Sequence, residues 1–303
     1  MFATLLNIVI PVFAVVAVGF VIGRRQTSRP QSSRPQTNSD MSFVNLANVL
    51  VFCPALVFSA LIEHPVQLSS SWPLIVAGVL VIIVPGAILF GLRVKGLERR
   101  TLAMGGMFRN TGNIGIPLMM LAYGDDKMGA IIILFVLSNL VHFSLGLFML
   151  SHTAGRWQWL KNPLVWAALL GLGLAEHQAM LPDFVLTSSQ LLGQIAVPLM
   201  LFALGVRLAQ GEIGHLGMAL RVNLIYLAVG AVSFLLVAWW LPLSTDWLQL
   251  LALSVMLPPA VLNYLLCEQY QCQPNKMASI VLLGNVMSVV TIPAVIYLTL
   301  IFI

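Results

Sequence analysis

Charged residues are scarce in this chain, and their scarcity excludes a soluble globular protein. Of the 303 residues, 8% are charged and 59% are hydrophobic, whereas a soluble domain carries about 25% charged residues. A bilayer core about 30 Å thick requires about 20 apolar residues per helix. The chain therefore has room for about ten membrane spans and for no soluble domain of useful size. The predicted fold class is an all-α polytopic membrane protein.

Groups that perform enzymatic or metal chemistry are also scarce. The three cysteines, Cys53, Cys267 and Cys272, do not have the spacing of a metal site. The sequence contains neither HExxH nor GxSxG. Every Asp and Glu falls in a predicted loop or at the end of a predicted span, so no acid is placed to carry a proton at the centre of the membrane. These absences argue against an enzyme, against a cofactor and against proton coupling through a buried carboxylate.

Apolar windows between polar breaks define ten predicted spans. They cover residues 4–22, 42–62, 72–92, 101–123, 128–150, 163–180, 186–206, 217–241, 247–269 and 277–302. The first connection, residues 24–40, includes SRPQSSRPQTNSD, a composition that cannot bury enough apolar surface to fold. We expect a mobile linker there. The first span has its basic residues after it rather than before it, the reverse of a cleavable signal, so it should stay attached.

Basic residues fall in alternate loops of this topology. Apart from Arg109 and Lys127, they lie in loops 1–2, 3–4, 5–6, 7–8 and 9–10: Arg24, Arg25, Arg29 and Arg34; Arg93, Lys95, Arg99 and Arg100; Arg156 and Lys161; Arg207 and Arg221; and Lys276. Cytoplasmic loops retain Lys and Arg. The pattern predicts that both termini lie outside a cytoplasmic (inner) membrane. The net charge of +5 then reflects topology and does not indicate a nucleic-acid partner.

Helix-breaking and polar residues recur in the two halves of the chain. Three positions form the pattern: Pro54, Pro117 and Asn139 in the first half, and Pro198, Pro259 and Asn285 in the second. Counted from the first position, the intervals are 63 and 85 residues in the first half and 61 and 87 in the second. A duplicated unit of five spans must be inserted upside down, as in many secondary transporters. The pattern predicts inverted repeats over residues 1–150 and 151–303, although prolines also occur freely in membrane helices.

The fourth span, which contains GGMFRNTGNIGIPLMMLAYG (105–124), is a poor helix former. The residues responsible are Asn110, Thr111, Gly112, Asn113, Gly115 and Pro117. In lipid, an unwound segment survives only where it is buried against protein or lines a polar cavity. Arg109 lies nine residues beyond Arg100, or about 13 Å along a helix, near the bilayer centre. A charge there costs at least about 2.5 kcal/mol. We expect Arg109 to bind a substrate anion, the alternative being that it caps carbonyls freed by the break.

The ninth span is interrupted at Pro258 and Pro259, which remove two backbone donors. This break lies at about the same depth in the membrane as the break in the fourth span. Where broken helices meet, the N-terminal ends of the half-helices present free N–H groups and partial positive charge to an anion. The candidate substrate-binding residues are Arg109, Asn110, Thr111, Asn113, Asn263, Tyr264, Asn139 and Asn285. The candidate structural residues of the crossing are Gly112, Gly115, Pro117, Pro258 and Pro259. Asn139, Asn285 and His142 have interhelical hydrogen bonds as an alternative role, and Asn48 could line an inner vestibule.

Four stretches resemble the auxin efflux carrier family, which includes plant auxin exporters and bacterial carriers proposed for malonate or malate. They are RNTGNIGIPL (109–118), LPPAVLNYLL (257–266), IAVPLMLFALGVRLA (195–209) and NVLVFCPALVFSAL (48–61). The resemblance covers all ten spans and implies a five-plus-five inverted fold similar to that of bile acid symporters and sodium/proton antiporters, with spans 4 and 9 crossing. It also implies a scaffold of spans 1, 2, 6 and 7, which often dimerises, and a transport unit of spans 3–5 and 8–10. The family's Asn and Pro positions at the crossing correspond to Asn113, Pro117, Pro259 and Asn263; the role of Arg109 does not come from the resemblance.

Together, these features predict a secondary carrier that moves a mono- or dicarboxylate by alternating access. Uniport driven by the membrane potential and symport with a sodium ion both stay open, because Asn, Thr and backbone carbonyls can hold sodium. A rival class is an intramembrane sensor that binds a ligand without moving it. A channel is disfavoured because the polar motifs are single and do not form a ring.

Overall fold

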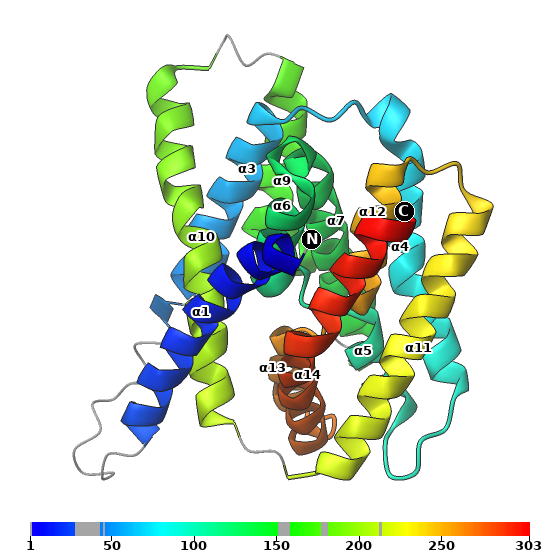
Figure 1. Ribbon diagram of the computed structural model, residues 1–303. Helices are drawn as coiled ribbons and strands as arrows, with labels where there is room; N and C mark the ends of the chain where they lie inside the picture. The colour runs from blue at the N-terminus through cyan, green and yellow to red at the C-terminus, as the bar shows by residue number, and fades with distance from the viewer. Residues whose placement is uncertain (1, 28–42, 45, 151–157, 177–180, 212–213) are drawn as a thin grey trace.

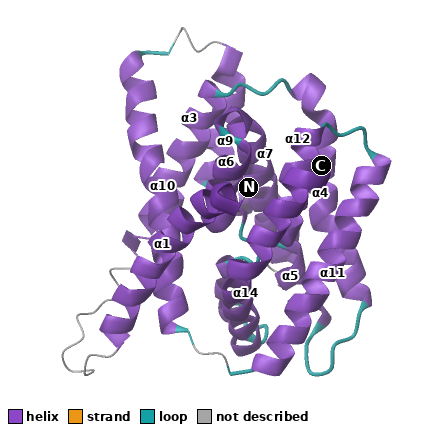
Figure 2. Ribbon diagram, viewed as in Figure 1, coloured by secondary structure: helices purple, strands orange, loops and turns teal. Residues whose placement is uncertain are grey.

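The computed structural model describes residues 2–27, 43–44, 46–150, 158–176, 181–211 and 214–303. Within these residues the secondary structure is helical, apart from one isolated bridge (Figures 1 and 2). Six of the described helices are long and apolar enough to cross a membrane: Leu6–Arg25, Ser69–Gly91, Asp125–Leu150, Asp183–Gln210, Leu216–Trp240 and Pro274–Phe302. The described part of the chain is that of a multi-pass membrane protein.

The uninterrupted helices fall on the predicted apolar windows. They are α1 (Phe2–Thr27), α4 (Leu68–Gly91), α9 (Pro163–Leu174), α10 (Asp183–Gln210), α11 (Leu216–Trp240) and α14 (Pro274–Phe302). α1 continues past the predicted end of its span, so residues 24–27 of the predicted linker are helical. The rest of that prediction, residues 28–40, lies outside the described residues. Pro198, which marked a break in the sequence pattern, lies within the continuous α10.

Two other windows contain a π-helical turn, in which one extra residue widens the helix. The turn η2 (Asn48–Phe52) leads into α3 (Cys53–Glu63). The short 3₁₀ turn η4 (Asp125–Lys127) leads into α7 (Met128–Val141), which continues through the π-helical turn η5 (His142–Gly146) into α8 (Leu147–Leu150). Another 3₁₀ turn, η6 (Gln158–Lys161), precedes α9.

Both interruptions predicted from Gly and Pro are present. α5 (Arg99–Met107) ends before a third π-helical turn, η3 (Thr111–Gly115), which leads into α6 (Ile116–Tyr123). α12 (Thr245–Met256) ends before the two prolines, and α13 (Val261–Gln269) begins after them. Each of these windows therefore holds two shorter helical segments with non-helical backbone between them.

The helices pack in two groups. α1 lies along α10, and α3 packs against α9 and α10, all toward the left of Figure 1. In the other group, α4 packs against α5, α7 and α11, and α14 packs against α11, α12 and α13. The contact between α1 and α10 is very close, since a Cβ atom built on Gly205 would lie 2.0 Å from the carbonyl oxygen of Val16. α1 and α10 therefore meet backbone to backbone.

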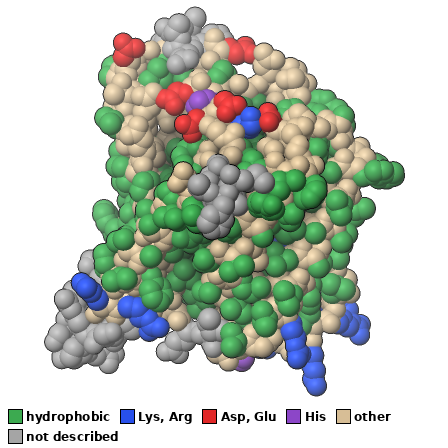
Figure 3. All heavy atoms as spheres, viewed as in Figure 1, with side chains coloured by type: hydrophobic (Ala, Val, Ile, Leu, Met, Phe, Trp, Pro, Cys, Tyr) green, Lys and Arg blue, Asp and Glu red, His purple; other side chains and the backbone are tan. Residues whose placement is uncertain are grey.

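Charges are separated between the two ends of the molecule. In Figure 3, acidic side chains gather at one end, and Lys and Arg side chains project mostly at the other. Lys127 lies among the acids and forms ion pairs of 3.0 Å with both Asp126 and Asp246. This separation agrees with the alternation of charge along the sequence, while the orientation in a membrane stays a prediction.

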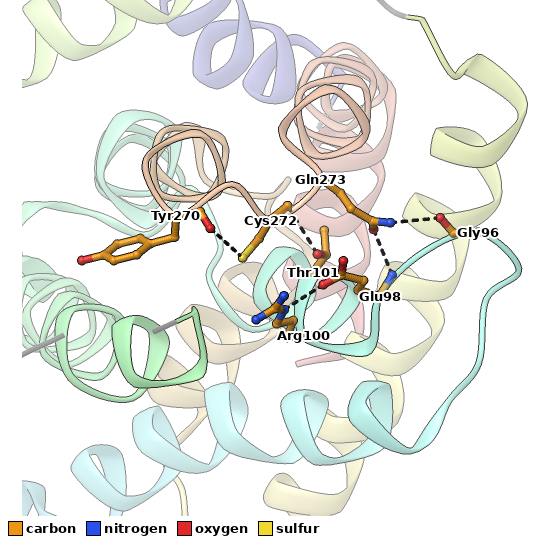
Figure 4. A network of polar contacts seen from close by, with 7 residues as sticks. All are labelled: Gly96, Glu98, Arg100, Thr101, Tyr270, Cys272 and Gln273. Carbon is orange, nitrogen blue, oxygen red and sulfur yellow. Dashed lines mark hydrogen bonds and ion pairs between the residues drawn. The ribbon is translucent and has the colours of Figure 1, made fainter. Parts of the chain in front are cut away.

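Polar contacts join the α4–α5 connection to the α13–α14 connection (Figure 4). The Glu98 N–H donates to Gln273 Oε1 at 2.9 Å, and Gln273 Nε2 donates to the Gly96 carbonyl at 3.4 Å. The Thr101 hydroxyl donates to the Cys272 carbonyl at 3.5 Å. The network therefore ties α5, from the fourth span, to α13, from the ninth span. The two helices are held as one unit at this end.

We predict that Gln273→Ala weakens this attachment. Loss of two hydrogen bonds at a partly exposed site should lower the free energy of unfolding by about 1 kcal/mol. Gln271→Ala is the matched control, because Gln271 and Gln273 both have positive φ (53° and 52°) and the Gln271 side chain donates to the Glu268 carbonyl of the preceding helix, α13, instead of to the α4–α5 connection. Thermal unfolding in detergent compares the two variants, and equal shifts would show that the link between the connections contributes nothing.

Candidate functional site

The two interruptions lie against each other and satisfy each other's backbone. The Asn110 N–H donates to the Pro258 carbonyl at 2.8 Å, and the Ala260 N–H donates to the Phe108 carbonyl at 3.0 Å. These bonds accompany the isolated antiparallel bridge between Arg109 and Pro259. In lipid, a backbone group without a partner costs several kcal/mol. The pairing therefore explains how two non-helical segments persist in the interior of an apolar protein.

Asparagine side chains reinforce this junction. Asn263 is fully buried and donates to the Phe108 carbonyl at 2.9 Å. Asn110 donates to Asn285 Oδ1 at 3.1 Å, and Asn285 in turn donates to the carbonyls of Pro259 and Val281 at 3.3 and 2.8 Å. These contacts join the two interrupted segments to α14.

Arg109 is 7% exposed, and its guanidinium is bound to the protein backbone. Nη1 donates to the Leu257 carbonyl at 3.2 Å and Nη2 donates to the Tyr226 carbonyl at 2.9 Å. The guanidinium carbon also lies 5.5 Å from the centre of the Tyr226 ring. The guanidinium therefore caps carbonyl groups, as in the alternative prediction for Arg109. The carbonyls belong to α11 and to the end of α12, however, and not to the break in the fourth span. Anion binding by Arg109 stays a prediction.

A cavity of about 230 Å³ lies beside the junction, between the two groups of helices. Its polar lining consists of Asn48, Arg109, Asn110, Thr111, Asn113, Ser138, Asn139, His142, Asn162 and Arg207. Arg109 is part of the lining, whereas Leu257 and Tyr226, whose carbonyls bind its guanidinium, are not. Among the remaining predicted site residues, Gly112 also lines it, whereas Asn263, Tyr264 and Asn285 do not.

The predicted structural residues at the junction have a different place. Gly115, Pro117, Pro258 and Pro259 do not line the cavity; they shape the interruptions. Pro117 lies in the first turn of α6, directly after η3, and it supplies no N–H to that part of the helix. The Tyr264 hydroxyl donates to the Glu268 carboxylate at 3.0 Å, away from the cavity.

The three π-helical turns all border the cavity. η2 contributes Asn48, η3 contributes Thr111 and η5 contributes His142. Such turns are rare and frequently occur at functional sites, because the widened backbone alters the direction of side chains and frees carbonyl groups. No sequence pattern used above predicts them, and Ser138, Asn162 and Arg207 were not among the predicted site residues.

Two polar groups in the lining are buried without a partner among the described residues: Asn48 Oδ1 and His142 Nε2. The His142 ring is held in place by stacking on Phe108, with ring centres 4.0 Å apart and planes 3° from parallel. Buried polar groups in proteins are almost always hydrogen-bonded. Both atoms are shielded from solvent, and their residues line the cavity.

The first turns of two helices also face the cavity. Thr111, Gly112 and Asn113 begin η3, which continues into α6, while Val261 and Leu262 begin α13. Neither start is capped by a side chain. A helix start has N–H groups without intrahelical partners and partial positive charge. Two such ends that meet at one cavity make it a place where a negative charge is stabilised.

A larger opening of about 870 Å³ adjoins this cavity. It lies between the end of α10, the residues before α11, α13 and the start of α14. Among the described residues, the two spaces share four in their lining: Leu204, Arg207, Val261 and Leu265. Tyr264 and Glu268 line this vestibule, so Tyr264 lies on the route to the cavity.

An all-helical apolar fold with a polar cavity at its centre is typical of membrane transport proteins. The chain belongs to the membrane transport protein family, which it matches over residues 4–159 and 155–296. It is also 25% identical over 327 aligned residues to a protein of Rhizobium meliloti (strain 1021) described as "Putative malonate transporter", with 98% of this chain and 96% of the relative covered.

Proposed function

We propose that this protein is a secondary carrier that moves a small organic anion across the inner membrane by alternating access. The proposal rests on one observation above all: two uncapped helix starts and two buried unpaired polar groups meet at the same cavity. Helix starts favour an anion, while Asn48 and His142 offer directional hydrogen bonds to its oxygens.

The size of the cavity and the family relationship support a small carboxylate as substrate. A volume of about 230 Å³ is below the range of about 300–1,000 Å³ for drug-sized ligands, and it suits a molecule of a few carbon atoms. The Rhizobium relative is described as a transporter of malonate, a three-carbon dicarboxylate. A lipid or a large amphiphile would not fit this space.

The packing of the helices supports an alternating-access mechanism. In the proposal, α1, η2–α3, α9 and α10 form the scaffold, which can dimerise, and the second group of helices forms the transport unit. The chain then makes ten spans as two inverted repeats, with both termini outside. Asn139 and Asn285, which occupy equivalent places in the two repeats, each donate to the carbonyl four residues earlier, Phe135 and Val281.

For energy coupling we favour uniport of the anion, driven outward by a negative interior. Symport with sodium is the second candidate, in which Asn, Thr and carbonyl oxygens near the junction hold the ion. The two differ in a measurable way, because uniport responds to the membrane potential in the absence of any sodium gradient.

Counterflow in proteoliposomes tests the proposed function. Vesicles with purified protein and unlabelled malonate inside should accumulate labelled malonate from outside, and a panel of other mono- and dicarboxylates should compete. Stimulation by an imposed sodium gradient would select symport over uniport. Binding of the anions without any exchange would contradict a carrier and indicate a sensor.

We predict that His142→Phe weakens transport while the fold is kept. Phenylalanine preserves the stacking on Phe108 but removes the ring nitrogens, and loss of a hydrogen bond to a charged ligand costs about 1.5–3 kcal/mol. The half-saturating malonate concentration should rise roughly tenfold or more. His215→Phe, in the vestibule, is the control and should change it little. Equal effects of the two substitutions would argue against a ligand role for His142.

A further inference from the structure

Arg207 is the charged side chain that links the vestibule to the cavity. It lies in the last turn of α10 and is partly buried. Of the four residues that line both spaces, the other three, Leu204, Val261 and Leu265, are apolar. An anion that moves from the vestibule into the cavity therefore passes this guanidinium.

The charge of Arg207 is not neutralised by the described part of the protein. The ion pairs found among the described residues involve Glu98, Asp126 and Asp246, and no described group accepts a hydrogen bond from the Arg207 guanidinium. Glu268, an acid in the described part of the vestibule lining, accepts a hydrogen bond from the Tyr264 hydroxyl instead. Among the described residues that line the cavity, none is acidic.

The other arginine in the lining differs in this respect. Arg109 donates to two backbone carbonyls and is directed toward α11 and α12. Of the two arginines, Arg207 is the one whose guanidinium has no hydrogen-bond partner among the described residues, and we take it as the one that can bind a ligand. A guanidinium binds a carboxylate through two parallel hydrogen bonds, the strongest such contact available to a side chain.

Arg207 and the helix starts belong to different groups of helices, although α10 also packs against η3. α10 is fixed to α1 through the Gly205 contact and packs against α3 and η2, whereas η3 and α13 belong to the junction of the two interrupted spans. A ligand with one negative charge can satisfy either Arg207 or the helix starts. A ligand with a negative charge at each end can satisfy both.

We propose that the substrate is a small dicarboxylate, with one carboxylate bound by Arg207 and the other by the starts of η3 and α13. This inference rests on the proposed carrier function and names its substrate class and a specificity-determining residue. The dianion joins the scaffold to the transport unit, so it is held by both groups of helices during the change of access.

The test compares malonate with its monomethyl ester, which has nearly the same size and one negative charge fewer. Both compete with labelled malonate in counterflow by wild-type protein, Arg207→Gln, Arg207→Lys and Arg221→Gln. Arg221 is an exposed basic residue of α11 that lines neither space, so it controls for the loss of a positive charge.

Wild-type protein should prefer malonate to the ester by roughly 10- to 100-fold, the range expected for one charged hydrogen-bonded contact. Arg207→Gln should lose that preference and still respond to the ester, which also shows that it is folded. Arg207→Lys should keep part of the preference, and Arg221→Gln should match wild type.

Three results would overturn the proposal while the carrier function stands: equal affinity of wild-type protein for malonate and the ester, exchange of monocarboxylates without any dicarboxylate, or an unchanged preference in Arg207→Gln. The first two need no variant. Absence of exchange by wild-type protein with every organic anion would instead refute the proposed carrier function itself.

Discussion

Arg109→Ala should destabilise the protein strongly and abolish transport as a consequence. The substitution removes two charge-assisted hydrogen bonds, to the carbonyls of Leu257 and Tyr226, and leaves both carbonyls in the apolar interior. Each hydrogen bond to a charged group contributes about 1.5–3 kcal/mol. We expect the free energy of unfolding to fall by about 3 kcal/mol or more, measured by thermal or detergent denaturation of the purified protein.

Comparison with Arg207 separates a structural effect from a substrate effect. Arg109→Lys keeps the charge but not the two-pronged geometry, so it should lie between wild type and Arg109→Ala in stability. Arg207→Gln should unfold near the wild-type temperature and still lose its preference for malonate. If Arg109→Ala kept wild-type stability but lost anion binding, the guanidinium would bind the substrate, as predicted from its depth in the membrane.

The interruptions could be predicted from the sequence because their cause is local. Pro258 and Pro259 lack backbone donors wherever they occur, and Gly112 and Gly115 weaken a helix in any environment. In lipid, such segments need a polar partner. For this reason the sequence predicts that Asn110, Thr111 and Asn113 lie near a polar cavity. The partners themselves depend on which segments meet in three dimensions.

Arg109 shows the limit of an argument from depth. The sequence indicates that a charge is buried, and hence that it has a partner, but the partner can be a ligand or the protein. The direction of the side chain is set by α11, which supplies the Tyr226 carbonyl and the ring beneath the guanidinium. α11 is more than 100 residues away along the chain, and no local pattern connects the two.

Arg207 was missed because of a helix boundary. The predicted span ended at residue 206, which assigned Arg207 to a loop as one more basic residue on the cytoplasmic side. α10 continues to Gln210, so the side chain lies within the helix and borders the cavity. Helix ends are the least certain part of a prediction from hydropathy, and long basic side chains at such ends are easily taken for loop charges.

The π-helical turns could not be predicted because they depend on tertiary contacts. The sequence around Asn48 and His142 is apolar and compatible with a regular α-helix. The extra residue is tolerated where the surrounding helices and the cavity accommodate the wider backbone. Both residues are recognisable in the sequence as polar groups in apolar spans, whereas their unpaired atoms become evident only from the structure.

The close contact of α1 with α10 leads to a second strong prediction, for Gly205→Ala. A Cβ atom at this position would lie 2.0 Å from the Val16 carbonyl oxygen and 2.7 Å from the Phe20 nitrogen. Both atoms belong to the backbone, so the two helices must move apart. Loss of close packing along a membrane helix pair removes its main source of stability, because lipid provides no hydrophobic driving force between helices.

We expect Gly205→Ala to lower the free energy of unfolding by about 1–3 kcal/mol, the usual cost of overpacking, and to displace the wall that carries Arg207, only two residues away. Gly173→Ala in α9 is the matched control, because its Cβ would meet no atom within 4 Å. The control should keep wild-type stability.

If Arg207 binds the substrate, Gly205→Ala should also reduce the preference for malonate over its monoester, since the guanidinium shifts with α10 relative to the starts of η3 and α13. A loss of stability with full preference retained would show that the α1–α10 contact supports the fold but does not set the position of Arg207.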